Sequence, residues 1–185
     1  REFVALVKAS PGKYSFASSG TGASAHLVAE WFNGLAGVQV THIPYKGSVP
    51  ALTDVISGRV DYAFETVAAT MPHIKSGRLK TYGISMGRAS VLAPGIEPLA
   101  TAAGLPSFDA AAWIGLMVTA GTPKAVVARL GAAMETAMQS PEVREKLLTI
   151  GVEFDYRRTG EFTRYLADQS TRYADIIREG NIKIE

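Results

Sequence analysis

Residues 18–26, SSGTGASAH, place small polar side chains and glycines between a strand-like stretch and a helix with an apolar stripe. A helix N-terminus exposes free backbone N–H groups and a partial positive charge, and glycines let a ligand approach the backbone closely. A carboxylate or a phosphate could bind there without any Lys or Arg. The spacing matches neither the dinucleotide nor the Walker fingerprint, because Gly20-Thr21-Gly22 lacks a third glycine and no Lys follows. An ordinary strand-to-helix turn with a capping serine is the alternative explanation.

Two other polar positions also follow strand-like stretches. Glu65 and Thr66 come at the end of VDYAFE and before a helix, and Tyr45 ends VQVTHIPY. Ligands in open α/β sheets bind outside the carboxyl ends of the strands, so these residues could face the same crevice as residues 18–26. The alternatives stay open: Glu65 could be a solvated residue favoured by the helix dipole, and Tyr45 could be half-buried packing.

The residues that could support catalysis or metal binding do not form a set. His26, His42 and His73 are scattered, and none pairs with another at a spacing typical of metal ligands. The stretch GISMG nominally matches a nucleophile elbow, but no later histidine completes a triad in the expected order. The absence of cysteine excludes disulfides and thiolate nucleophiles. We therefore expect no cofactor, no metal and no catalysis. A hydrolase or transferase that uses the Ser/Gly loop with His26 as its base is the enzymatic alternative.

The overall composition is that of a globular protein. Of 185 residues, 47% are hydrophobic and 19% charged, which suffices for a buried core. The net charge is only +2 and the longest basic run is Arg157-Arg158, so the sequence lacks the basic patch typical of nucleic-acid binding. No apolar run approaches the length of a membrane span. The chain does not begin with Met, and we expect it to be a fragment or a processed product.

Helix and strand patterns alternate along the chain. Strands are expected over residues 14–17, 38–45, 60–65, 79–85, 111–120 and 152–157, and helices over 1–11, 24–35, 48–57, 67–75, 123–139, 141–150 and 160–179. Prolines and glycines in residues 87–108 predict a long connection with at most one helical turn. The segment 111–120 should be a buried strand, and the apolar stripes of 123–139 and 160–179 should also be buried. This alternation predicts an α/β fold with a parallel or mixed sheet covered by helices.

Six stretches together resemble the solute receptors of tripartite tricarboxylate transporters, the Bug-type (TctC-type) family of extracytoplasmic binding proteins. They run over nearly the whole chain: PGKYSFASSGTGASAHLVAEWF, VQVTHIPYKGSVPALTDVISGRVDYAF, MPHIKSGRLKTYGIS, GTPKAVVARL, SPEVREKL and IIREGNIK. The resemblance implies an α/β fold of the periplasmic binding protein type II class, in which two lobes close on a small carboxylate. Residues 1–110 would form the second, ligand-binding lobe. Residues 111–185 would supply the crossover strand and the C-terminal part of the first lobe, whose N-terminal half is absent.

The resemblance also implies the site residues. Residues 18–26 stand where the family has its second-lobe ligand loop, with Ala23 and Ala25 in place of the common Thr and Ser. Glu65 stands where the family often has Asp, which meets the ligand's amine in amino-acid-binding members, and Thr66 stands where Asn is common. The predicted ligand-binding residues are Ser18, Ser19, Gly20, Thr21, Gly22, Ala23, Ser24, His26, Tyr45, Glu65 and Thr66.

On this resemblance we expect a periplasmic receptor for a small carboxylic acid, including amino and hydroxy acids. It would deliver the acid to the permease subunits of a tripartite tricarboxylate-type membrane transporter. A ligand-sensing regulatory domain of a transcription factor, which shares the type II fold, is the alternative. A signal peptide and a further half-lobe upstream of Arg1 would favour the receptor, and a basic helix-turn-helix would favour the regulator. We also expect self-association, because open strand edges and uncovered apolar helix faces invite pairing with another chain.

Overall fold

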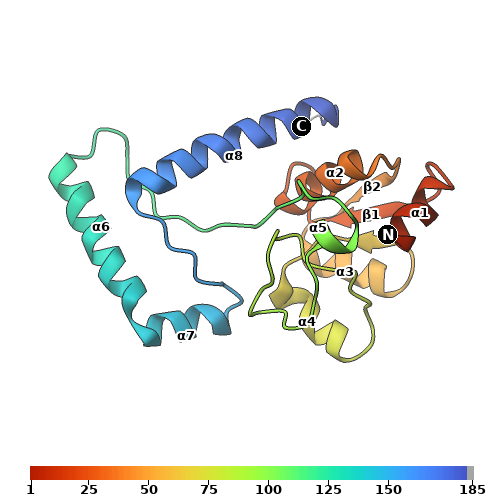
Figure 1. Cartoon of the computed structure of the whole chain (residues 1–185), viewed down its shortest axis with the longest axis horizontal. Helices are drawn as coiled ribbons and strands as arrows, with labels where there is room; N and C mark the ends of the chain where they lie inside the picture. Colours follow the sequence, from red (N-terminus) through yellow and green to blue (C-terminus); the bar gives the residue numbers. More distant parts are fainter. Residues whose placement is uncertain (183–185) are drawn as a thin grey trace. The chain divides into compact units, whose positions relative to one another are not determined.

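The computed structural model describes residues 1–182, which divide into two compact units (Figure 1). The first unit comprises Arg1–Ala111 together with the chain from Tyr173 onward. The second unit comprises Ala112–Arg172.

A three-stranded parallel sheet lies at the centre of the first unit. β1 (Ser15–Ser18) lies between β2 (Thr41–Pro44) and β3 (Tyr62–Ala63). Both neighbours pair with β1 in the parallel direction. The carboxyl ends of all three strands therefore meet at one edge of the sheet, as the sequence predicts.

Five helices belong wholly to the first unit: α1 (Glu2–Lys8), α2 (Ser24–Ala36), α3 (Ser48–Ile56), α4 (Val67–Lys75) and α5 (Leu99–Ala102). The predicted positions of the first four helices and of the first three strands are confirmed, although β2 and β3 are shorter than expected. The predicted connection over 87–108 is confirmed too, since it holds only the single turn α5.

Aromatic residues fix α2 against the sheet. On one face of the helix, Ala29 and Phe32 are buried at the spacing of adjacent helical turns. Ala29 belongs to the same core cluster as Phe16 of β1, and Phe32 contacts the ring of Phe108 at a centroid distance of 5.5 Å. Burial of one such aromatic side chain contributes about 2–3 kcal/mol. This packing holds the N-terminus of α2 next to the end of β1.

The strand predicted over 79–85 is wrong. Only one isolated bridge forms there, between Ile84 and Pro98. Gly83 has a φ of +150°, and a Cβ atom at this position would lie 2.7 Å from the carbonyl oxygen of Glu97. The close approach of the connecting segment to Gly83 replaces the extended pairing that the apolar pattern suggests.

The second unit contains α6 (Lys124–Gln139), α7 (Pro141–Thr149) and most of α8 (Thr159–Glu179). The helices occur where the sequence predicts them. No strand forms within the described residues of this unit, so the strands predicted over 111–120 and 152–157 are wrong. Residues 112–120 are exposed rather than buried. An apolar segment becomes a strand only where a neighbouring strand supplies its backbone hydrogen bonds, and this unit offers none.

The expected burial of the α6 stripe is also wrong. Val126 and Leu130 are 45% and 40% exposed, and no residue of α6 is buried. On α8 the expected inward residues are half-buried: Phe162, Tyr165, Leu166, Tyr173 and Ile177. Helix stripes are buried only against a sheet or other helices, and the second unit holds no sheet for α6 to cover.

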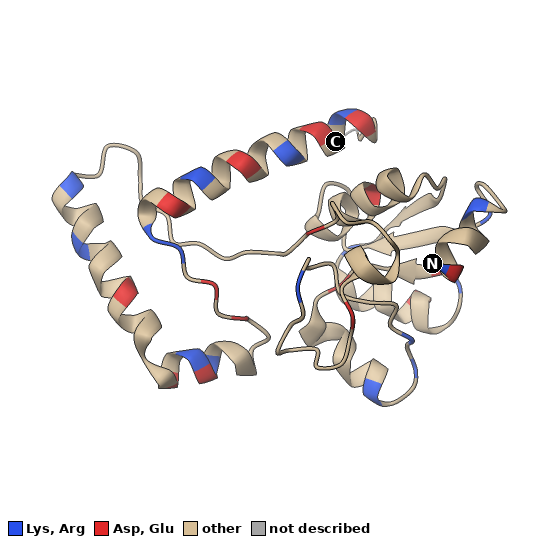
Figure 2. Ribbon diagram, in the orientation of Figure 1, with Lys and Arg blue, Asp and Glu red and all other residues tan. Residues whose placement is uncertain are grey.

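Charged residues are spread along α8 with alternating sign, as Figure 2 shows. Its Glu161, Arg164, Asp168 and Arg172 recur about one turn apart. These charges mark the solvated face of an amphipathic helix, whose apolar residues are half-buried. None of the helices formed by residues 1–182 combines the length and the apolarity needed to cross a membrane.

Candidate functional site

The loop between β1 and α2 contains most of the predicted ligand-binding residues. Gly20 and Gly22 have φ angles of +144° and +77°, which side-chain-bearing residues rarely adopt. A Cβ atom at Gly20 would lie in ordinary van der Waals contact, 3.6 Å from the carbonyl oxygen of Tyr45, so the constraint there is the backbone conformation and not the space. The path of this loop therefore depends on both glycines.

The N-terminus of α2 has no side-chain cap in the described loop. Its N-cap residue is Ala23, and the first hydrogen bond of the helix runs from the Leu27 amide to the Ala23 carbonyl oxygen at 3.1 Å. The amides of Ser24, Ala25 and His26 precede this bond and are the donors that a helix N-terminus leaves without intrahelical acceptors. The turn with a capping serine, raised from the sequence as the alternative, is not formed here. An anion can approach these amides without displacing a cap.

Two histidine side chains form hydrogen bonds with the loop. The Gly22 amide donates to Nδ1 of His26 at 3.0 Å, and Nε2 of His42 lies 2.6 Å from the hydroxyl oxygen of Ser18. The two imidazole rings are stacked, with centroids 3.8 Å apart and an interplanar angle of 9°. Phe16 of β1 packs beside both rings, with its centroid 4.8 Å from that of His42 and 6.1 Å from that of His26. The loop is thus tied at Ser18 and at Gly22 to one aromatic stack.

Burial keeps both imidazoles neutral. It lowers the pKa of His26, and it lowers the pKa of His42 to about 4, with repulsion from His26 as a second cause. Because Nδ1 of His26 accepts a hydrogen bond, the ring proton lies on Nε2, which is 3.5 Å from Oε1 of Glu30. Burial raises the pKa of the Glu30 carboxyl group.

These contacts bear on the hydrolase alternative. A general base needs a ring nitrogen that can reach the proton of a bound substrate. Nδ1 of His26 is engaged by Gly22, and the whole residue is only 4% exposed. His26 was predicted from the sequence as a ligand-binding residue, but its hydrogen bond with Gly22 was not predicted. His42 was not predicted as part of the site, although its place on a strand beside β1 was a usable signal.

Tyr45 lies beside the loop through its backbone. Its amide donates to the Ser18 carbonyl oxygen at 3.0 Å. Its hydroxyl donates to Oδ2 of Asp54 at 2.8 Å, and Arg59 binds the other oxygen of that carboxylate at 2.9 Å. The hydroxyl therefore has a partner on α3, and Tyr45 contacts the loop through its backbone amide.

Glu65 and Thr66 have different surroundings. Thr66 is the N-cap of α4, where its hydroxyl accepts a hydrogen bond from the Ala69 amide at 3.4 Å. Glu65 is half-buried, and among the described residues its buried Oε1 atom has no hydrogen-bond partner. A buried carboxylate oxygen without a donor costs free energy, so a donor supplied by a ligand would be favourable there.

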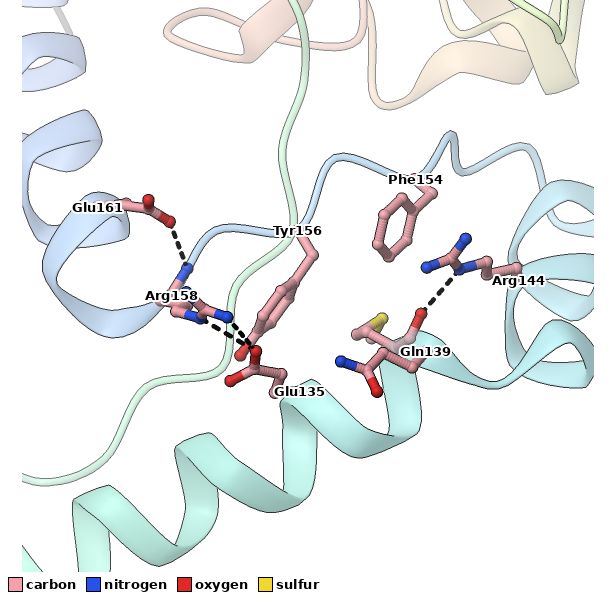
Figure 3. Close-up of a pocket in the computed structure, with 8 residues that line it drawn as sticks. Glu135, Gln139, Arg144, Phe154, Tyr156, Arg158 and Glu161 are labelled. Atoms are coloured by element: carbon pink, nitrogen blue, oxygen red, sulfur yellow. Dashed lines mark hydrogen bonds and ion pairs between the residues drawn. The ribbon is translucent and has the colours of Figure 1, made fainter.

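The second unit holds a pocket of ≈ 310 Å³, formed between α6, α7 and the segment before α8 (Figure 3). Arg158 pairs with Glu135 through its guanidinium group and donates its amide to Glu161 at 3.1 Å. The Arg144 guanidinium lies over the ring of Phe154, 4.1 Å from its centroid. The charged side chains of this pocket thus already have partners within it, and none of the predicted site residues lines it.

Known proteins match the chain over its length. The family model for the tripartite tricarboxylate transporter family receptor (TctC) matches residues 1–182. A UPF0065 protein from the tcbD-tcbE intergenic region of Pseudomonas sp. strain P51 is 37% identical over 156 residues, which are 83% of this chain and 46% of that protein. Protein BugT of Bordetella pertussis is 32% identical over 182 residues, which are 98% of this chain and 56% of BugT. The chain therefore spans about half the length of these relatives.

Solved structures also match. MatC from Rhodopseudomonas palustris with bound malate has a TM-score of 0.77 and 28% identity, and the match covers 95% of this chain and 60% of that one. Periplasmic binding proteins are among the other structural matches. The predicted fold class, a partial α/β fold of the periplasmic binding protein type II class, is confirmed.

Proposed function

The chain belongs to the family of tripartite tricarboxylate transporter receptors, and from this premise we propose that it binds a small carboxylic acid in the periplasm for delivery to the permease subunits of such a transporter. Receptors of this family bind solutes and are not enzymes. The observation that carries the proposal is the uncapped N-terminus of α2 at the carboxyl edge of the parallel sheet. Ligands in open α/β folds bind at this edge.

The proposed mechanism is binding by backbone amides followed by closure. A ligand carboxylate would accept hydrogen bonds from the amides of Ser24 and Ala25, aided by the helix dipole. The exposed hydroxyls of Thr21 and Ser24 are further donors. Gly20, Gly22 and Ala23 would leave room for close approach. Closure of two lobes would then exclude water from the ligand.

The remaining predicted residues are proposed to have supporting roles. Ser18 and His26 would hold the loop in shape through their contacts with His42 and Gly22. Ser19 continues this support, since its carbonyl oxygen accepts a hydrogen bond from the Gly47 amide at 3.2 Å. Tyr45 and Thr66 would shape the walls of the site.

Glu65 is proposed to select the ligand. Its unpaired buried oxygen favours a ligand with a donor near the carboxylate, such as a hydroxy or amino acid. The similarity to MatC, whose structure contains malate, supports a hydroxy acid as the first probe.

The division of the chain into lobes is a further part of the proposal. Residues 1–110 would form the ligand-binding lobe, and residues 111–185 would form the crossover and the C-terminal part of the other lobe. The boundary of the two compact units at Ala111 supports the first limit.

A titration with malate, followed on backbone amide NMR signals, tests the proposal. We expect the amides of Ser24, Ala25 and His26 to shift in a saturable way. Malamide is the matched control, because it keeps the hydroxyl and the carbon chain but lacks both carboxylates. Shifts confined to Arg144 and Tyr156 would instead assign the binding to the α6–α7 pocket and would overturn the loop as the site.

A further inference from the structure

The aromatic stack at the ligand loop is built from one helix and two strands. His26 comes from the first turn of α2, His42 from β2, and Phe16 from β1. In the parallel register Phe16 is directly opposite His42. Each imidazole offers one ring nitrogen to the loop, His26 to the Gly22 amide and His42 to the Ser18 hydroxyl.

We propose that His26 is a positioning residue for the ligand loop, with His42 as its support, and that the loop keeps its binding shape only while the His26 ring is neutral. The identification of this loop as a ligand site rests on the proposed function. The positioning itself depends only on the contacts of the two rings.

The position of the His26 proton makes this arrangement sensitive to acid. With Nε2 already protonated, a second proton can only add at Nδ1, which now accepts from the Gly22 amide at 3.0 Å. Protonation would set two N–H groups against each other and break this hydrogen bond. It would also place a positive charge on a ring stacked 3.8 Å from His42.

The other charged and titratable groups around the stack are few. Glu30, on α2 itself, lies 3.5 Å from Nε2 of His26 and would stabilise a protonated ring. Tyr62 of β3 packs against Phe16 and donates its hydroxyl to Asn33. Burial raises the pKa of Tyr62, so it stays neutral. Asp61, next to Tyr62, is engaged by the amide and hydroxyl of Ser15.

Glu30 lowers the cost of protonating His26. It cannot restore the hydrogen bond from the Gly22 amide, because it lies near Nε2 whereas that bond is made at Nδ1. The ligand loop should therefore loosen when His26 takes up a proton. Binding of a carboxylic acid would then weaken at acidic pH by more than the protonation of the acid itself explains.

The experiment follows the Gly22 amide and the two imidazole rings by NMR in the full chain, from about pH 7 to about pH 4. We expect the neutral His26 ring to carry its proton on Nε2. The protection of the Gly22 amide against hydrogen exchange, corrected for intrinsic rates, should fall about tenfold with the same midpoint as the His26 ring, as expected for one lost hydrogen bond. A Gly22 amide that stays protected while His26 titrates would overturn the proposal.

Two variants sharpen the test. His26→Asn keeps an acceptor near the position of Nδ1 but does not titrate, so its Gly22 amide should change less than about twofold over the same range. His73→Asn removes a half-buried imidazole from α4 and should behave like the unmodified chain. An equal loss of protection in His26→Asn and the unmodified chain would also overturn the proposal. The titration of the unmodified chain decides the question even where a variant does not fold.

Malate binding measured in parallel separates this proposal from the proposed function. We expect malate affinity to fall more steeply with acid in the unmodified chain than in His26→Asn, whose residual slope reports the protonation of malate. Equal slopes would count against the role of His26 in binding. If malate binds neither protein at neutral pH, the choice of ligand fails, while the response of Gly22 still decides whether His26 positions the loop.

Discussion

The rings of His26 and His42 lie parallel, 3.8 Å apart, in a position where neither can become charged without cost. Both have a pKa below the value of about 6.5 expected in the unfolded chain, and that of His42 is about 4. Between these pH values the unfolded chain binds more protons than the folded one. The free energy of unfolding should therefore fall as the pH is lowered from about 6.5 to about 4.

We expect this loss to total about 1–2 kcal/mol, since one pKa unit corresponds to about 1.4 kcal/mol and water screens the partly exposed His42. Urea unfolding at several pH values measures it. His73→Asn should leave the dependence unchanged, whereas His42→Asn should reduce it. A slope that is the same in all three proteins would show that the histidine stack does not control acid stability.

Gly22→Val should abolish binding at the loop. The φ of +77° is strained for valine, and its side chain would obstruct the approach to the N-terminus of α2. Gly58→Val is a closely matched control, because Gly58 has a φ of +76° and open space around it, at the end of α3. Both variants should lose stability, but only Gly22→Val should lose malate binding by calorimetry. If Gly22→Val binds as well as Gly58→Val, the loop does not contact the ligand.

Ser24→Ala should weaken binding only moderately. The Ser24 hydroxyl is exposed and would add one hydrogen bond to a charged ligand, while the backbone amides would remain. The loss should be about 1–3 kcal/mol, the contribution of a hydrogen bond to a charged group. Calorimetry with malate measures it, and Ser57→Ala, another exposed serine of the first unit, is the control. Complete loss of binding in Ser24→Ala would show that the side chain, and not the backbone, carries the contact.

Most helices and strands of the first unit could be predicted, because the residues that begin and end them lie next to them in the sequence. Glycines follow the helices, as at Gly37, where φ is +61° at the end of α2. The strands that failed depend instead on partners. Residues 111–120 are apolar enough for a buried strand, but a sequence does not show whether a neighbouring strand will pair with it. The apolar residues of α6 likewise recur at the helical period, and the helix forms. They stay unburied because the second unit contains no sheet for this helix to pack against.

The candidate site was predictable only in part. The small residues of the loop predict a helix N-terminus. The sequence also shows that Ala23 has no side chain that could cap the helix. The stack of His26 on His42 could not be predicted, because it depends on the parallel register of β1 and β2. The capping role of Thr66 follows from a local rule, whereas the unpaired oxygen of Glu65 depends on burial.

Self-association should follow from the apolar surface of residues 113–118. Ile114, Leu116 and Met117 are 81%, 62% and 62% exposed. An exposed run of this kind favours contact with another apolar surface. We expect sedimentation velocity to show concentration-dependent association that the double variant Ile114→Asp/Met117→Lys reduces. The pair of changes is neutral in net charge, so overall charge does not confound the comparison. A monomer at high concentration would contradict this expectation.

Glu65→Gln should change which acids bind. The carboxylate of Glu65 would accept a hydrogen bond from the hydroxyl of malate. The glutamine side chain has the same shape as glutamate but carries no charge. Malate affinity should fall about tenfold, which corresponds to the loss of one charge-assisted hydrogen bond.

Succinate is the matched ligand, because it differs from malate only in lacking the hydroxyl group. Its affinity should hold or rise in Glu65→Gln, since the charge at Glu65 repels a second carboxylate and succinate has no hydroxyl group to donate a hydrogen bond to Glu65. Glu97→Gln, an equal change of charge at an exposed residue of the first unit, should leave both affinities unchanged. The ratio of malate to succinate affinity, measured by calorimetry, is the decisive quantity because it cancels any general effect on stability. A ratio that stays constant in Glu65→Gln would mean that Glu65 does not meet the ligand.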